Sequence, residues 1–222
     1  MIIDTHTHVV SSDKTKHPLD VGASGWSTEV SNDVEDLIAE MDAAGVECAT
    51  LVQPNGTYGL DNIYQCDSAK LYYPRTVSVG ILDPSASDAA DKLSYWVNEH
   101  GMLGVRLQTP ADADDPRCDA IWQRAGELNV PISIGGGGQP DRVNRMTNIA
   151  RRHPNVLFAP DHFAGWSGAD DKPGMTGPWR RWPSFLTRTF VTPAPASVPM
   201  LTWKILKNTF SVGLLKRSRP NG

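Results

Sequence analysis

Short apolar segments alternate with amphipathic segments along the first 160 residues of the chain. The short segments are apolar throughout, which is typical of strands in a parallel sheet covered by helices. Between them, apolar residues recur three or four positions apart, which predicts helices. The predicted strands cover residues 2–10, 47–53, 75–82, 102–107, 131–135 and 155–159. The predicted helices begin near Ser31, Asp61, Ser87, Pro116 and Pro140.

This alternation predicts an α/β fold of the (β/α)8 TIM-barrel type. A closed barrel of this type has eight strands and typically about 250 residues, whereas six strand-helix units are recognisable in this 222-residue chain. From Gly174 onward the sequence shows no regular period. We therefore divide the chain into a barrel portion, residues 1–175, and an atypical basic C-terminal segment, residues 176–222.

The charge balance changes at the same place. All 25 acidic residues lie within residues 1–175, whereas residues 176–222 hold eight of the 21 Lys and Arg. One hypothesis is that this segment is translated out of the ancestral reading frame and truncates the barrel, which translation of the other two frames tests. A rival hypothesis is a basic segment for an anionic partner. Because its bases are scattered without a regular face, we expect neither nucleic acid nor a membrane as partner.

The rest of the composition indicates an ordinary globular enzyme. The longest apolar runs are far shorter than the roughly 18 to 20 residues of a membrane helix. Three widely spaced cysteines indicate neither a disulfide framework nor a zinc ribbon, and we expect Cys48 to be a core residue of the second strand. We expect a cytoplasmic location, and nothing in the sequence indicates an oligomeric state.

Two histidines near the end of the first strand are the first candidates for chemistry. His6 and His8 are two residues apart, so a regular strand projects both from one face, with Asp4 on the same side. Imidazole is a common ligand of zinc, iron and manganese, and the C-terminal ends of barrel strands carry the active site. The alternative is that these polar residues simply alternate outward on an edge strand.

Further candidates follow the later strands. His162 follows the sixth strand and could complete a site with the first two histidines, or it could merely begin the next loop. Arg106 near the end of the fourth strand could bind a substrate carboxylate with its guanidinium fork, or form a salt bridge to a loop acid. Gln108 at the end of that strand is another candidate for substrate binding. Tyr58, after the second strand, could reach the substrate or could only pack.

Several motifs, taken in order, resemble the amidohydrolase superfamily, and within it the amidohydrolase-related branch that contains 2-pyrone-4,6-dicarboxylate lactonase. The resemblance covers about residues 1–170. The motifs are Ile3-Asp4-Thr5-His6-Thr7-His8, His17-Pro18-Leu19, Gly45-Val46, Gly104-Val105-Arg106-Leu107 and Pro160-Asp161-His162-Phe163.

The resemblance implies a (β/α)8 barrel that hydrolyses a lactone or similar ester. It places His6, His8 and His162 in the site and Arg106 on a substrate carboxylate. Family members commonly use an aspartate at the end of strand eight as general base, yet no carboxylate follows Asp171 in this chain. Members also differ in metal use, and a glycine, Gly135, stands where metal-dependent members carry a ligand histidine on strand five. That departure favours the lactonase branch.

We therefore expect hydrolysis of a small carboxylated lactone or similar cyclic ester. The three histidines would polarise the carbonyl, either directly or through one divalent ion such as zinc or manganese. One alternative is metal-dependent decarboxylation of a carboxylated ring compound. Another is an inactive, truncated remnant of the barrel.

Overall fold

The computed structural model of the chain describes residues 2–107, 114–134 and 142–160. Four features discussed above lie outside these described residues: Gln108, the glycine run 135–138, His162 and the segment 176–222 with its proposed boundary.

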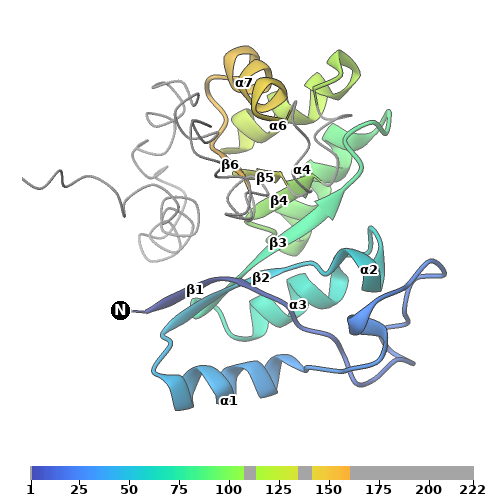
Figure 1. Cartoon of the computed structure of the whole chain (residues 1–222), viewed down its shortest axis with the longest axis vertical. Helices are drawn as coiled ribbons and strands as arrows, with labels where there is room; N and C mark the ends of the chain where they lie inside the picture. The colour runs from blue at the N-terminus through green and yellow to red at the C-terminus, as the bar shows by residue number, and fades with distance from the viewer. Residues whose placement is uncertain (1, 108–113, 135–141, 161–222) are drawn as a thin grey trace, which may run out of the picture.

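A single parallel sheet of six strands runs through the described residues, with the strands side by side in sequence order (Figure 1). This arrangement confirms the barrel-type fold that the sequence predicts. The first five strands lie within their predicted ranges, whereas the sixth begins three residues late and ends one residue late. The strands are β1 Ile3–Thr7, β2 Cys48–Val52, β3 Thr76–Leu82, β4 Gly104–Leu107, β5 Ile132–Ile134 and β6 Phe158–Pro160.

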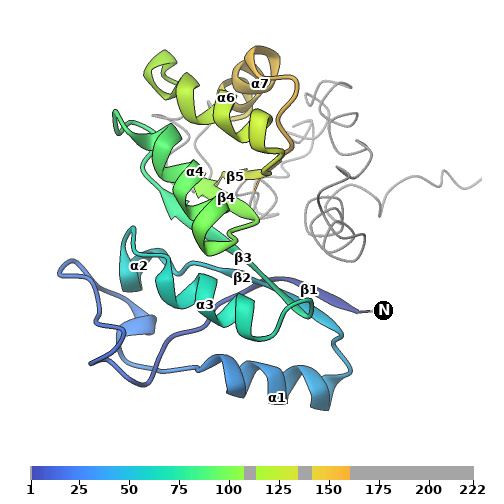
Figure 2. The same cartoon turned by 180° about the vertical axis from the view of Figure 1, so that it is seen from behind.

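Helices connect successive strands and follow the outer side of the curved sheet (Figures 1 and 2). None of the helices in the described residues combines the length and apolar character needed to cross a bilayer. The α-helices are α1 Val34–Ala44, α2 Asn55–Tyr58, α3 Ile63–Leu71, α4 Ala89–His100, α6 Asp119–Leu128 and α7 Arg142–Arg152. The same residues include two short 3-10 helices, η1 Trp26–Thr28 and η2 Pro116–Cys118.

Two local predictions need correction. The first helix begins three residues after the predicted start at Ser31, because α1 starts at Val34 and Asp33 occupies the cap position. The Asp33 side chain does not bond to the helix N–H groups, since it accepts hydrogen bonds from Ser12 N and the Tyr64 hydroxyl. The segment after β2 contains the short helix α2, which is absent from the predicted helices.

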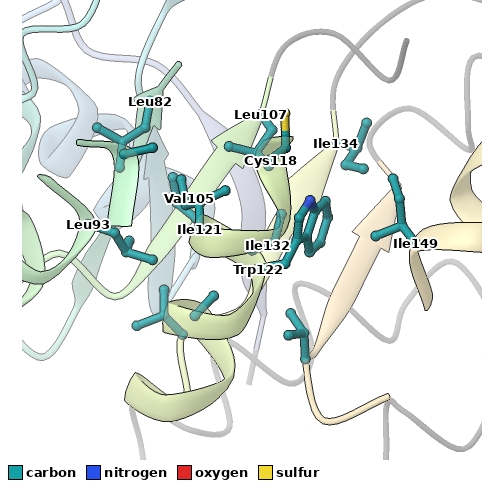
Figure 3. Close-up of a cluster of buried hydrophobic side chains, with 14 of the residues drawn as sticks. Leu82, Leu93, Val105, Leu107, Cys118, Ile121, Trp122, Ile132, Ile134 and Ile149 are labelled. Atoms are coloured by element: carbon teal, nitrogen blue, oxygen red, sulfur yellow. The ribbon is translucent and has the colours of Figure 1, made fainter. Parts of the chain in front are cut away.

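Alternate residues of the later strands pack against the helices. Val105 and Leu107 of β4 and Ile132 and Ile134 of β5 join the buried side chains of α4, α6 and α7 in one apolar cluster (Figure 3). Trp122 of α6 is fully buried within it. Side chains alternate along a strand. The residue between Val105 and Leu107 and the residue between Ile132 and Ile134 therefore project from the opposite face of the sheet.

Arg106 and Ser133 are those intervening residues, and they pair side by side on β4 and β5. The helix-side cluster therefore fixes which face carries the candidate arginine. Cys48 of β2 is 4% exposed, which confirms it as a core residue, and the three cysteines are buried free thiols.

Candidate active site

An irregularity in β1 decides which way its histidines face. Ile3 and Asp4 pair with Cys48 and Ala49 of β2, whereas Thr7 pairs with Leu51, so β1 contains one extra residue between Asp4 and Thr7. An extra residue of this kind reverses the alternation of side chains beyond it.

The helix side of β2 is marked by Ala49 and Leu51, which pack with residues of α1. Asp4 and Thr7, as their partners, lie on that side, and His8, which follows Thr7, lies on the opposite side. The expectation that Asp4 shares a face with His6 and His8 is therefore wrong, because it assumed a regular strand. The Asp4 carboxylate instead accepts a hydrogen bond from His6 N at 3.1 Å.

His8 is oriented by the neighbouring strand. Its Nδ1 lies 2.7 Å from the carbonyl oxygen of Val52, the last residue of β2. A carbonyl only accepts hydrogen bonds, so Nδ1 carries the proton and Nε2 of the neutral ring presents a lone pair. The same carbonyl accepts a hydrogen bond from the buried Gln65 Nε2 at 2.9 Å. Backbone support of this kind is typical of histidines that bind metal or transfer protons.

The rings of His6 and His8 lie edge to face, with centroids 5.0 Å apart and an interplanar angle of 87°. Two imidazoles that bind one zinc ion tetrahedrally have ring centres about 5 Å apart, given Zn–N distances of about 2.0–2.1 Å. The separation of the two rings is therefore compatible with a shared divalent ion. Among the described residues, no group of three or more His, Cys, Asp or Glu side chains could hold a metal. His162, the predicted third histidine, lies outside them.

Arg106 lies near the end of β4, 9% exposed, between Ile81 of β3 and Ser133 of β5. A guanidinium stays protonated even when buried, so this face of the sheet carries a permanent positive charge. Three strand spacings separate β1 from β4, about 14 Å along the sheet. That Arg106 and the histidines contact one small molecule stays a prediction.

Tyr58 has a defined structural partner. Its side chain is 4% exposed, and its hydroxyl accepts a hydrogen bond from Ser11 N at 2.8 Å. Burial raises the pKa of this phenol, so it remains protonated at neutral pH. The structure thus places Tyr58 where it holds the segment after β1, and its contact with a substrate stays a prediction.

A neighbouring polar network fixes the same segment. The Asp33 carboxylate accepts hydrogen bonds from Ser12 N at 2.9 Å and from the Tyr64 hydroxyl at 3.0 Å. Burial opposes ionisation of Asp33, but these hydrogen bonds outweigh it and lower the pKa of the carboxyl. The Tyr64 ring lies 4.6 Å from the ring of His17. The segment after β1 is therefore held at several points beside the candidate site.

One residue of this region was not singled out from the sequence. The Trp26 ring lies 6.1 Å from the ring of His8, although 18 positions separate them in the chain. The sequence does indicate that this segment is near the site, because the segment after a barrel strand lies at the active-site end of the barrel. Which of its residues meets the histidine depends on tertiary contacts.

The sequence profile of the amidohydrolase family matches residues 3–192. The chain belongs to the amidohydrolase family. The match extends beyond residue 175, into the basic segment that the sequence analysis separates. Among curated proteins, none matches the sequence significantly.

Solved structures of similar fold are consistent with this family. A "probable 2-pyrone-4,6-dicarboxylic acid hydrolase" from Acinetobacter baumannii is 19% identical, with a TM-score of 0.55 over 73% of this chain and 58% of its own. A proposed hydrolase of the same name from Pseudomonas putida is 21% identical, with a TM-score of 0.56 over 72% of this chain and 56% of its own. The amidohydrolase chain thus spans less than two thirds of either structure.

A third similar structure is 5-carboxyvanillate decarboxylase from Novosphingobium aromaticivorans, complexed with manganese and 4-hydroxy-3-methoxy-5-nitrobenzoic acid. It is 16% identical, with a TM-score of 0.55 over 74% of this chain and 66% of its own. At these identities the three structures establish the shared barrel-type fold.

Proposed function

We propose that this amidohydrolase is a hydrolase that opens a small carboxylated lactone or similar cyclic ester. The observation that carries the proposal is the hydrogen bond from His8 Nδ1 to the Val52 carbonyl, which puts the lone pair of the neutral ring on Nε2, in a residue whose ring packs against that of His6. Arg106 supplies a buried positive charge at the same end of the sheet for the substrate carboxylate. The names of two similar structures, both hydrolases of a pyrone dicarboxylic acid, support the choice of substrate class.

Each residue has a chemical role in this proposal. Arg106 binds the carboxylate through two parallel N–H···O contacts and so orients the ring. When held by His6 and His8, a zinc or manganese ion supplies Lewis acidity for the ester carbonyl. In a metal-free enzyme, Nε2 of His8 accepts a proton from the attacking water, and the ring C–O bond breaks as that proton passes to the leaving oxygen. His162 is proposed as the third histidine around the carbonyl.

The remaining expectations belong to the same proposal. Gln108 and Tyr58 are proposed as further substrate contacts, and the partner is a small molecule in the cytoplasm, not a nucleic acid or a membrane. Metal-dependent decarboxylation of a carboxylated ring is the second candidate, favoured by the spacing of the His6 and His8 rings, which suits a shared ion. An inactive barrel remnant is the third.

A hydrolysis assay of the full chain with 2-pyrone-4,6-dicarboxylate tests the proposal. We expect turnover by the unaltered chain and a loss of about 100-fold or more in H8A, the usual range for a lost proton-transfer group. H100A is the matched control, because His100 bonds to Tyr95 on the outer helix α4, and it should keep full activity.

The same assay separates the alternatives. Activity that survives chelation supports the metal-independent lactonase type, whereas stoichiometric zinc or manganese with release of CO2 from a carboxylated ring supports the decarboxylase. Absence of both reactions in a folded chain supports the remnant. Equal activity of H8A and H100A contradicts the proposed site.

A further inference from the structure

We infer that Trp26 is a stacking surface for a flat, conjugated ring, so that the substrate of this site is a planar unsaturated or aromatic carboxylate and not a saturated ring. The inference rests on the function proposed above, because it assigns the ring type that lies between the histidines and Arg106.

The indole of Trp26 is available beside the candidate site. The side chain is 56% exposed, and its ring centroid lies 6.1 Å from that of His8 at an interplanar angle of 46°. A single exposed apolar side chain is common on protein surfaces and by itself indicates nothing. The position beside a histidine with a fixed ring orientation distinguishes this one.

The backbone that carries Trp26 is firmly attached to α2. Ser24 N donates to the Gly56 carbonyl at 2.8 Å, and Asp20 N donates to the Thr57 carbonyl at 2.8 Å. Ser27, which follows Trp26, is 3% exposed and accepts a hydrogen bond from the Thr57 hydroxyl. The tryptophan is therefore presented on a supported 3-10 turn.

Gly56 is required for this attachment. A Cβ atom on Gly56 would clash with the Ser24 carbonyl oxygen, which belongs to the backbone and cannot move aside without shifting the segment. The absence of a side chain thus lets the Trp26 segment approach α2 closely. A larger residue at this position would displace the segment and the indole with it.

The same strand-helix unit positions the histidine and the tryptophan. Val52, at the end of β2, fixes His8 through its carbonyl, and α2, three residues later, fixes the Trp26 segment. A surface ordered before binding loses little entropy when a ligand arrives. Flat π-systems stack favourably on an indole, whereas a puckered saturated ring makes only C–H contacts with its face.

The test compares two dicarboxylates that differ only in ring saturation: isophthalate and its cyclohexane counterpart. Calorimetric titration of the full chain should show that W26A weakens isophthalate binding about 10-fold and changes binding of the saturated probe by less than about twofold. W26F should retain most of the isophthalate affinity. Y95A removes another exposed aromatic ring, on α4, and should change neither probe.

The outcomes separate this inference from the proposed function. Equal effects of W26A on both probes, or none, overturn the stacking role and leave the hydrolase proposal standing. If R106L leaves both affinities unchanged, the proposed carboxylate contact fails, while the preference of Trp26 for the flat ring can still be measured. If the unaltered chain binds neither probe, the stacking inference is overturned, and the hydrolysis assay decides the proposed function separately.

Discussion

The two ends of the described sheet are stabilised by different means. Around β4 to β6 and their helices, one cluster of buried apolar side chains holds strands and helices together (Figure 3). Around β1 to β3 the apolar cluster is smaller, and buried polar side chains such as Gln65, Asn62 and Tyr58 bond to the backbone. The first region depends on hydrophobic burial, and the second on directed hydrogen bonds that also orient His8. Substitutions should therefore affect stability most in one region and geometry most in the other.

The largest effect is expected in the apolar region. W122A removes a fully buried indole from the cluster and should lower the free energy of unfolding by about 3–5 kcal/mol, measured by urea denaturation. W122F should cost less, because it keeps a ring in place. A loss below about 1 kcal/mol in W122A contradicts the claim that burial stabilises this region.

The next largest loss of stability is expected at Asn62, a polar side chain that bonds to the backbone of β3. Asn62 is fully buried, accepts from Ile81 N at 2.7 Å and donates to the Ile81 carbonyl at 3.0 Å. N62A leaves both backbone groups without these bonds and should cost about 1–3 kcal/mol of unfolding free energy. S85A, which removes an exposed hydroxyl after β3, is the control and should change stability by less than about 0.5 kcal/mol. Equal stability of the two variants contradicts the prediction.

Arg106 lies on β4, where the two regions meet, and its substitution tests the proposed substrate binding. R106L should raise KM for a carboxylated lactone about 10- to 100-fold, because a charged hydrogen-bond pair is lost, with a smaller change in kcat. R106K keeps the positive charge but not the fork of the guanidinium, so its KM should lie between that of the unaltered chain and that of R106L. Steady-state kinetics give both constants. An unchanged KM in R106L removes this residue from substrate binding.

The outcome for particular residues shows how far sequence reasoning extends. Strands and helices were predictable because their apolar residues lie where the period of the element places one face. Val105 and Leu107 show this in a strand, and Ile121 and Trp122 in a helix. The extra residue in β1 was not predictable, because the sequence gives no sign of where the alternation of side chains breaks. Asp4 was placed on the wrong face of the strand as a result. The place of Trp26 beside His8 depends on its attachment to α2, which no local pattern encodes.

The smallest expected effect is a pH dependence of the polar region. The pKa of Asp33 is lowered below its usual 3.8, so its hydrogen bonds contribute stability above that pH and lose it as the pH falls through the lowered value. Y64F removes one of these bonds and should cost about 1 kcal/mol at neutral pH, with a smaller loss once the pH has fallen below the lowered pKa of Asp33. Thermal melts across pH 2–7 measure both. A pH-independent difference between Y64F and the unaltered chain contradicts the role of Asp33.

The central claim is that β2 fixes His8 with its proton on Nδ1, so that Nε2 carries the lone pair. Long-range proton–nitrogen NMR of the histidine rings at a pH where they are neutral tests it directly, with H8A identifying the His8 signals. The account predicts the Nδ1–H tautomer for His8. A signal pattern of the Nε2–H tautomer would contradict it, because Nε2 could then neither bind an ion nor accept a proton from water.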